Sequence, residues 1–315
     1  MTIPVTIPAN IMDTTTAPPA TDADHIDAGR RTRICLLLAA ACVSGFMTTY
    51  LVAVRTARGQ ALDQIAGHGR NIQPRSFSTA AEHLLSTISQ GSIVMLTVLC
   101  LATAVARHRT HLALLVACFV GGAYTTTETL KLHVLTRPQL LPTVFWEMHN
   151  SLPSGHSSVS LCVVVALVLV VPRRWQGVAA VVGAPYAIGI GIAAAAVGGH
   201  RPSDVVASCF VVGAWLFALL AVAFRRGLFV ADERARWERF VGPALVFVLI
   251  AVVAVLGVVT LFGLFANASF VSPLGRRGAF KSALAYGLSV SVTATLTMSV
   301  IATLLWLVRD VRFDR

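Results

Sequence analysis

The chain has 315 residues, of which 56% are hydrophobic and only 12% are charged. A soluble domain usually carries about 25% charged residues, so this composition excludes an ordinary soluble protein and predicts a surface that faces lipid. The formal net charge is +11, and Lys131 and Lys281 are the only lysines beside many arginines. Because these arginines flank apolar stretches, they indicate membrane topology rather than a nucleic-acid-binding surface.

Residues 1–29 contain many Thr, Ala, Pro and Asp residues, lack hydrophobic periodicity and precede a basic run. They are too polar for the core of a signal peptide, which predicts a disordered cytoplasmic tail. Eight apolar stretches follow, each near the roughly 20 residues that a bilayer span requires. They occupy residues 34–54, 89–106, 111–131, 156–172, 177–198, 203–224, 241–265 and 282–308. We therefore expect an all-α, polytopic transmembrane helix bundle.

The segment between the first two stretches, residues 55–88, mixes polar and apolar residues. Its apolar side chains recur at helical spacing towards the end, at Ala80, Ala81, Leu84, Leu85 and Ile88. Such spacing predicts a helix that lies at the membrane interface.

The connecting segments set the expected orientation. They place 15 of the 25 basic residues on the side that holds both termini and 10 on the other side. Because short cytoplasmic loops are enriched in Arg and Lys, both termini are expected inside the cell. Segments 132–155 and 199–203 are then expected to meet at the outer face of the plasma membrane.

The six cysteines all fall inside apolar stretches and form no CxxC or Cys/His spacing. They are interpreted as small buried residues rather than as disulfide partners or metal ligands.

The first polar cluster is the pair Lys131 and Arg137, at the outer end of the third stretch. Taken alone, this pair has a simple explanation as two cationic side chains that reach from the bilayer to the interface. The same two cations are also suited to binding an anion at that interface.

The second cluster is Pro153-Ser154-Gly155-His156, directly before the fourth stretch. A helix start presents unpaired N–H groups and the positive end of its dipole, so Ser154 and Gly155 predict an anion site. His156 would stand beside the anion as a proton donor. The alternative is an ordinary helix cap followed by an interfacial histidine.

The third cluster comprises His200, Arg201 and Asp204, at the start of the sixth stretch. A carboxylate near an imidazole holds its tautomer and raises its basicity, as in covalent catalysis. The alternative is a loop histidine and an aspartate that favours the helix dipole. Together, the three clusters offer cations, N–H groups and two imidazoles on one face, a set that suits phosphate chemistry.

These motifs resemble the type 2 phosphatidic acid phosphatases, also called lipid phosphate phosphatases. The family pattern is Lys, six residues and Arg-Pro, then Pro-Ser-Gly-His, then Ser-Arg, five residues, His, three residues and Asp. The resemblance covers roughly residues 34–224. It implies that Lys131 and Arg137 bind phosphate and that Ser154 and Gly155 form the anion nest.

The resemblance also implies the catalytic roles. His156 would be the general acid, His200 the nucleophile that becomes phosphohistidine, and Asp204 the carboxylate that orients it. The family needs no metal, and neither a metal nor another cofactor is expected here.

The sequence departs from the family pattern at two places. Lys131 and Arg137 are separated by five residues rather than six, and Ala193 and Ala194 stand where Ser-Arg is expected. Losing one transition-state donor typically costs about 10²–10³ in rate. Arg201 is the nearest candidate to replace the absent arginine, and its alternative role is a headgroup anchor.

From these features we expect three regions: the tail 1–29, a six-span phosphatase-like core at 30–226, and two further spans with a short cytoplasmic C-terminus at 227–315. The expected activity is hydrolysis of a phosphomonoester or pyrophosphate of a lipid at the outer face. Candidate substrates are phosphatidate, phosphatidylglycerol phosphate and polyprenyl-linked phosphates. The Arg- and Ala-rich composition suggests a GC-rich bacterium, which favours a polyprenyl carrier of cell-wall synthesis. The alternatives are a lipid phosphoryl transferase and a non-catalytic member that binds or moves lipid. The expected partners are the lipid substrate and membrane lipids, with no nucleic acid.

Overall fold

The computed structural model describes residues 22–69, 73–141, 150–231 and 276–313. Its elements in chain order are α1 (Asp22–Thr49), the π-helical turn η1 (Tyr50–Val54), α2 (Ala57–His68), α3 (Arg75–Ser86), α4 (Gln90–Ala106), α5 (Thr110–Thr129), the π-helical turn η3 (Leu130–Val134), α6 (Gly155–Val170), α7 (Arg173–Ala196), α8 (Pro202–Arg225), β1 (Phe229–Ala231), α10 (Arg276–Leu307) and β2 (Val311–Phe313).

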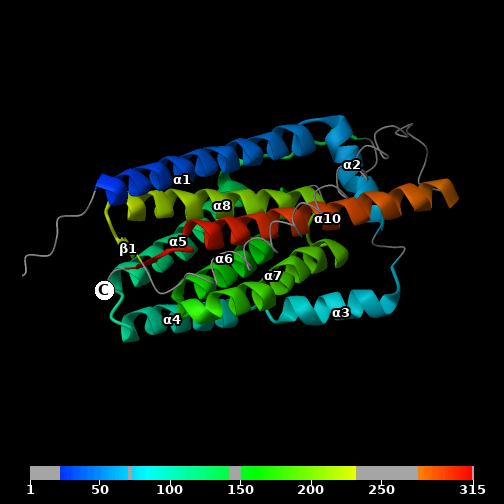
Figure 1. Cartoon of the computed structure of the whole chain (residues 1–315). Coiled ribbons are helices and arrows are strands. Elements are labelled where there is room, and N and C mark those ends of the chain that lie inside the picture. The colour runs from blue at the N-terminus through cyan, green and yellow to red at the C-terminus, as the bar shows by residue number, and fades with distance from the viewer. Residues whose placement is uncertain (1–21, 70–72, 142–149, 232–275, 314–315) are drawn as a thin grey trace, which may run out of the picture.

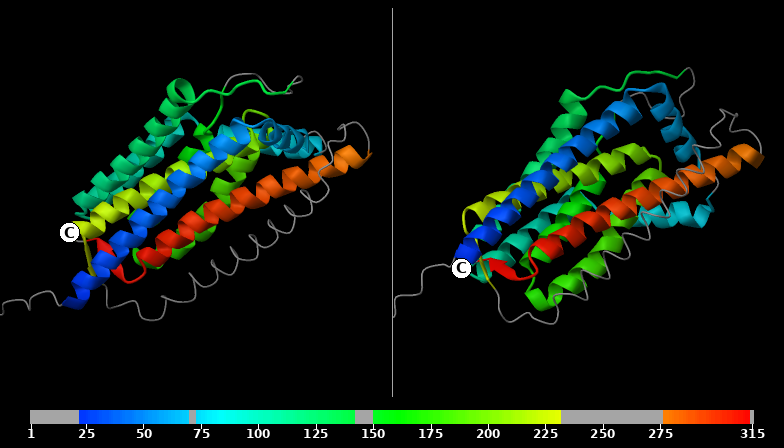
Figure 2. Two further views of the ribbon diagram at one scale, coloured as in Figure 1. Left: turned by 90° about the horizontal axis from the view of Figure 1, so that it is seen from above. Right: turned by 45° about the horizontal axis from the view of Figure 1, so that its top comes forward.

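The long helices form a bundle in which α8 occupies the middle. Helix α8 packs along α1, and it also contacts α5, α6 and α10 (Figures 1 and 2). Small residues permit close approach between helices, since a Cβ on Gly122 would come within 2.6 Å of the Trp215 ring. Fully buried side chains of α8 such as Leu216 and Leu220 lie in the main apolar core.

The all-α prediction is confirmed at the level of a membrane helix bundle. Within the described part of the chain, five helices are long and apolar enough to cross a membrane, or six if the bent pair α3–α4 is one span. Helix α6 is a shorter apolar helix. Seven of the eight expected stretches coincide with helices, and the stretch 241–265 lies outside the described residues.

Two expected boundaries differ from the structure. Helix α1 begins at Asp22, so residues 22–29, assigned from the sequence to a disordered tail, are helical. The mixed segment 55–88 contains two helices, α2 and α3, rather than one. Helix α3 lies against α7, and α2 contacts α10 and α8 (Figure 1).

One end of the bundle is stabilised by contacts of Arg31 and by a small two-stranded sheet, which the sequence did not predict. Arg31 donates from Nη1 to the Leu307 carbonyl at 2.6 Å and pairs through Nη2 with Asp310 at 2.7 Å. Beside it, β1 pairs antiparallel with β2, with Phe229 opposite Phe313. These contacts lie at the end of α1 opposite to α2 (Figure 2). The start of α8 lies at the α2 end, where the Ser203 N–H donates to Asp63.

Candidate active site

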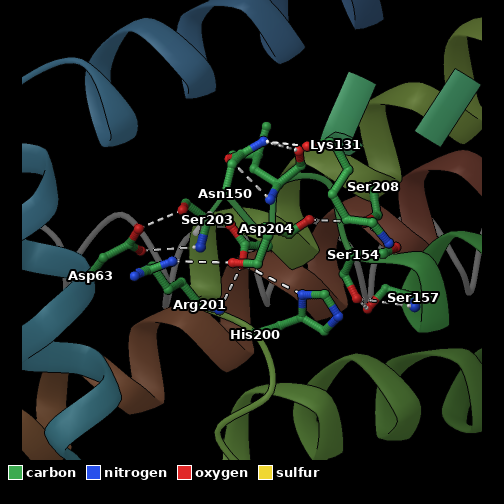
Figure 3. Close-up of polar contacts among 12 residues, drawn as sticks. Asp63, Lys131, Asn150, Ser154, Ser157, His200, Arg201, Ser203, Asp204 and Ser208 are labelled. Carbon is green, nitrogen blue, oxygen red and sulfur yellow. Dashed lines mark hydrogen bonds and ion pairs between the residues drawn. The ribbon is translucent and has the colours of Figure 1, made fainter. Parts of the chain in front are cut away.

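The second and third polar clusters are joined through the backbone. Ser154 caps α6 and is fully buried, and its N–H donates to the Asp204 carbonyl at 3.0 Å. The Ser208 hydroxyl donates to the Ser154 carbonyl at 2.8 Å. The starts of α6 and α8 are therefore held together, as expected from their common membrane face (Figure 3).

The two histidines of these clusters face one another. The ring centroids of His156 and His200 are 6.1 Å apart, and the ring planes make an angle of 67°. Reacting atoms in a productive complex lie about 3–3.5 Å apart. A single phosphorus atom between the rings would therefore be within reach of both imidazoles.

Asp204 is the centre of the buried polar network. Its carboxylate accepts hydrogen bonds from the Ser151 hydroxyl at 2.6 Å and the Arg201 N–H at 2.9 Å, and it pairs with Arg137 Nη2 at 3.2 Å. His200 Nδ1 lies 3.5 Å from Asp204 Oδ2, longer than a normal hydrogen bond (Figure 3). Because Nδ1 faces this carboxylate, Nε2 is the ring nitrogen left to approach a substrate.

Asp63, on α2, completes the network and was missed by the sequence analysis. Its carboxylate accepts from both the N–H and the hydroxyl of Ser203, in the first turn of α8, and Arg137 Nη1 lies 3.7 Å away. Burial, reinforced by the nearby charge of Asp204, raises the pKa of Asp63 to about 6. No motif in the sequence includes Asp63, and the only available signal was an acidic residue in a segment with few acids.

Arg201 lies inside the network rather than at the headgroup surface. Its side chain is buried, and Nη1 donates to the Ser151 hydroxyl at 3.1 Å. Burial and the nearby Arg137 charge lower the pKa of Arg201. Arg201 and Arg137 thus bring two guanidinium groups to the carboxylates of Asp63 and Asp204.

The two alanines at the departure from the family pattern are packing residues. Ala193 and Ala194 are 2% and 1% exposed, and Ala193 lies in an apolar cluster with Ala81 of α3. The Ala194 carbonyl accepts the N–H of His200 at 3.1 Å. Ala193 therefore helps to pack α3 against α7.

Lys131 lies beside the start of α6. Its Nζ pairs with Glu128, three residues earlier in the chain, at 2.7 Å. A Cβ on Gly155 would come within 2.9 Å of Glu128 Oε1 and 3.8 Å of Lys131 Nζ, so the ion pair sits directly over this helix start. Asn150 also contacts this segment, since its amide donates to the Lys131 carbonyl at 3.2 Å.

Comparison with known proteins finds a family match over part of the chain. Residues 121–229 match the model of the PAP2 superfamily, and this region contains all three polar clusters. This part of the chain, from α5 to β1, is therefore similar to the PAP2 superfamily. The PAP2 region begins within α5 and ends at β1, so α1, α2 and α10 lie outside it.

A search of solved structures and a search of curated proteins give two further comparisons. The chain is similar to the crystal structure of the first transmembrane PAP2 type phosphatidylglycerolphosphate phosphatase from Bacillus subtilis, with 23% identity and a TM-score of 0.44. That similarity covers 59% of this chain and 94% of the other. No curated protein matches the chain. Among the described residues, no group of three or more His, Cys, Asp and Glu side chains is placed to hold a metal ion.

Proposed function

We propose that this protein is a membrane phosphatase that hydrolyses a phosphomonoester or pyrophosphate of a lipid. The observation that carries the proposal is the pair of imidazoles, His156 and His200, with centroids 6.1 Å apart above the buried Asp204. The PAP2 domain supports the same class of reaction. The finer assignment of roles follows from the positions of the side chains.

In the proposed reaction, His200 Nε2 attacks the phosphorus atom in line with the leaving oxygen. The P–O bond to the lipid breaks as the N–P bond forms, and His156 donates its proton to the lipid oxygen. The imidazole of His200 gains positive charge, which Asp204 stabilises from the Nδ1 side. Water, deprotonated by His156, then attacks the phosphohistidine, and inorganic phosphate leaves with His200 restored.

The binding groups in this proposal are the positive groups around the imidazoles. Lys131 and Arg137 bind phosphate oxygens, and the α6 start at Ser154 and Gly155 supplies N–H groups. Arg201 takes the place of the absent motif arginine. The burial of Arg201 beside Asp204 supports this role. Unchanged phosphate release and unchanged KM in purified Arg201→Ala would contradict it.

The proposed site opens on the outer face of the plasma membrane, with both termini inside. The excess of basic residues at the opposite end, near Arg31, supports this orientation. The lipid tail remains in the bilayer while the phosphate reaches water at the helix starts. The proposed organisation is a six-span core at 30–226, two further spans in 227–315 and a tail formed by the N-terminal residues.

The decisive experiment is phosphate release in detergent, comparing wild type with His200→Ala. The lipid panel contains phosphatidate, phosphatidylglycerol phosphate, and polyprenyl mono- and pyrophosphate, so that the glycerolipid and cell-wall carrier alternatives compete directly. We expect release from at least one lipid and its loss in the variant. Equal release from both proteins would reject His200 as the nucleophile.

One feature favours a second candidate, a non-catalytic member that binds or moves lipid phosphates. The Ser-Arg positions are Ala193 and Ala194, and Lys131 and Arg137 already pair with carboxylates. Binding of the panel lipids without any phosphate release would favour this candidate. Transfer of the phosphoryl group to an added alcohol, in preference to water, would instead indicate a transferase.

A further inference from the structure

Among the described residues, the buried network contains equal numbers of acidic and basic side chains. Asp63 and Asp204 oppose Arg137 and Arg201, and all four side chains are largely buried. A phosphate group would bring extra negative charge into this balanced cluster. Because a buried charge is costly unless it is compensated, binding calls for a matching change of charge.

The two carboxylates are not held equally. Asp204 accepts hydrogen bonds from Ser151 and Arg201, and Arg137 Nη2 lies 3.2 Å from it. Asp63 accepts hydrogen bonds from Ser203, and its distance to Arg137 Nη1 is longer, at 3.7 Å. Asp63 is therefore the carboxylate whose ionic partner is more easily drawn away by a competing anion.

Helix α2 also positions the backbone next to Arg137. Gln60, one helical turn before Asp63, donates from Nε2 to the Pro138 carbonyl at 2.7 Å and accepts the Leu140 N–H at 3.3 Å. Helix α10 packs on the far end of α2, where Ser282 and Tyr286 approach Gly69. Helix α2 is thus fixed between α10 and the site, and it holds Arg137 by both its main chain and its side chain.

We propose that Asp63 is a positioning residue of this site, which holds Arg137 and the start of α8 before a phosphate group binds and takes up a proton when it binds. This inference rests on the proposed function, since it assumes that the phosphate lies at Arg137. The protonated carboxyl group still accepts the Ser203 N–H, so the start of α8 keeps its partner. Arg137 Nη1 is then released from one carboxylate and can donate to a phosphate oxygen.

The charges that face Asp63 support this exchange. Asp204 on α8 opposes its ionisation, and Arg137 and Arg201 favour it. Because its pKa is about 6, Asp63 is charged at neutral pH, and a modest further rise in this pKa would protonate it. A bound phosphate adds a second negative neighbour and draws Arg137 away, and both changes favour the neutral carboxyl group.

The test is calorimetric titration of inorganic phosphate into the purified full-length protein at pH 7, in two buffers with different ionisation enthalpies. The proteins are wild type, Asp63→Asn and the matched control Asp310→Asn, which removes a carboxylate paired with an arginine at the other end of the bundle. On binding phosphate, wild type and the control should each take up as much as one proton more than Asp63→Asn does. We also expect the affinity of wild type to weaken relative to Asp63→Asn by about tenfold per pH unit above pH 6.

The outcomes separate this inference from the proposed function. Equal proton uptake by wild type and Asp63→Asn, with phosphate bound by both, would overturn the role of Asp63 and leave the phosphatase proposal intact. An absence of phosphate binding by wild type would reject the site itself and the inference with it. Since asparagine keeps the size of aspartate and an acceptor for Ser203, phosphate binding by the variant also reports that it is folded.

Discussion

Replacing Asp204 with asparagine should destabilise the protein far more than the loss of one charge at its surface. The carboxylate is fully buried, and every hydrogen it contacts is donated to it, by Ser151, Arg201 and Arg137. If the amide oxygen of asparagine faces Ser151 and Arg201, its NH₂ group points at the Arg137 guanidinium, 3.2 Å away in wild type. If it is turned the other way, NH₂ meets the Arg201 N–H. Either orientation leaves a buried donor without an acceptor.

The expected cost follows from this geometry. Breaking a buried ion pair by removing one partner costs about 3–5 kcal/mol. That corresponds to a fall in Tm on the order of 10 °C. Asp310→Asn is the matched control, because Asp310 is 30% exposed and its partner Arg31 keeps its bond to the Leu307 carbonyl. Its loss should cost about 1 kcal/mol or less.

The assay is thermal unfolding of both variants in the same detergent, followed by tryptophan fluorescence and by phosphate release below Tm. Asp204→Asn should also lose activity at temperatures where it is folded, because the charge that stabilises the His200 imidazolium is gone. Similar Tm values for Asp204→Asn and Asp310→Asn would contradict the description of Asp204 as the centre of a buried network.

Three further predictions concern other parts of the bundle. In Gly155→Ala, the new Cβ would come within 2.9 Å of Glu128 Oε1 and disturb Lys131, so KM should rise on the order of tenfold. The control Gly177→Ala, whose Cβ would have nothing within 4 Å, should leave KM unchanged and stabilise α7 slightly. Equal KM values for the two variants in steady-state assays would contradict this prediction. Arg31→Ala loses its bonds to Leu307 and Asp310 and should lower Tm by several degrees without changing kcat at low temperature, and a change in kcat with normal Tm would be inconsistent with a purely structural clamp. Because the pKa of Asp63 is raised to about 6 on folding, its carboxyl group contributes roughly 3 kcal/mol of stability below about pH 4, and this contribution is lost as pH rises through about 6. The difference in Tm between Asp63→Asn and wild type should therefore shift in favour of the variant as the pH rises from 4.5 to 8, and a shift in favour of wild type would contradict this sign.

The sequence allowed much of this site to be predicted because charged residues are rare in apolar spans. His156 precedes one span and His200 another, with two spans between the loops that carry them, so the alternation of spans alone brings both to one face. The spacing of four residues between His200 and Asp204, at the start of α8, likewise brings imidazole and carboxylate close together. These inferences need only local sequence and a bilayer.

Asp63 escaped prediction because its role depends on tertiary packing. A single aspartate in a mixed helix has no motif, and its partner Ser203 is 140 residues away. The β1–β2 pair is likewise too short to be recognised in either strand alone, since each has three residues. The reason for Ala193 became apparent only once α3 was seen to pack over it.

Covalent trapping of the phosphoryl group is the most direct measure of the chemistry proposed for His200. Wild type is mixed with a lipid phosphate that it hydrolyses and is quenched in alkali, where phosphohistidine survives. Mass spectrometry should then detect a peptide phosphorylated at His200, and the His200→Ala variant should give no phosphorylated peptide. Steady phosphate release by wild type with no phosphate on His200, or with equal labelling in the variant, would contradict it.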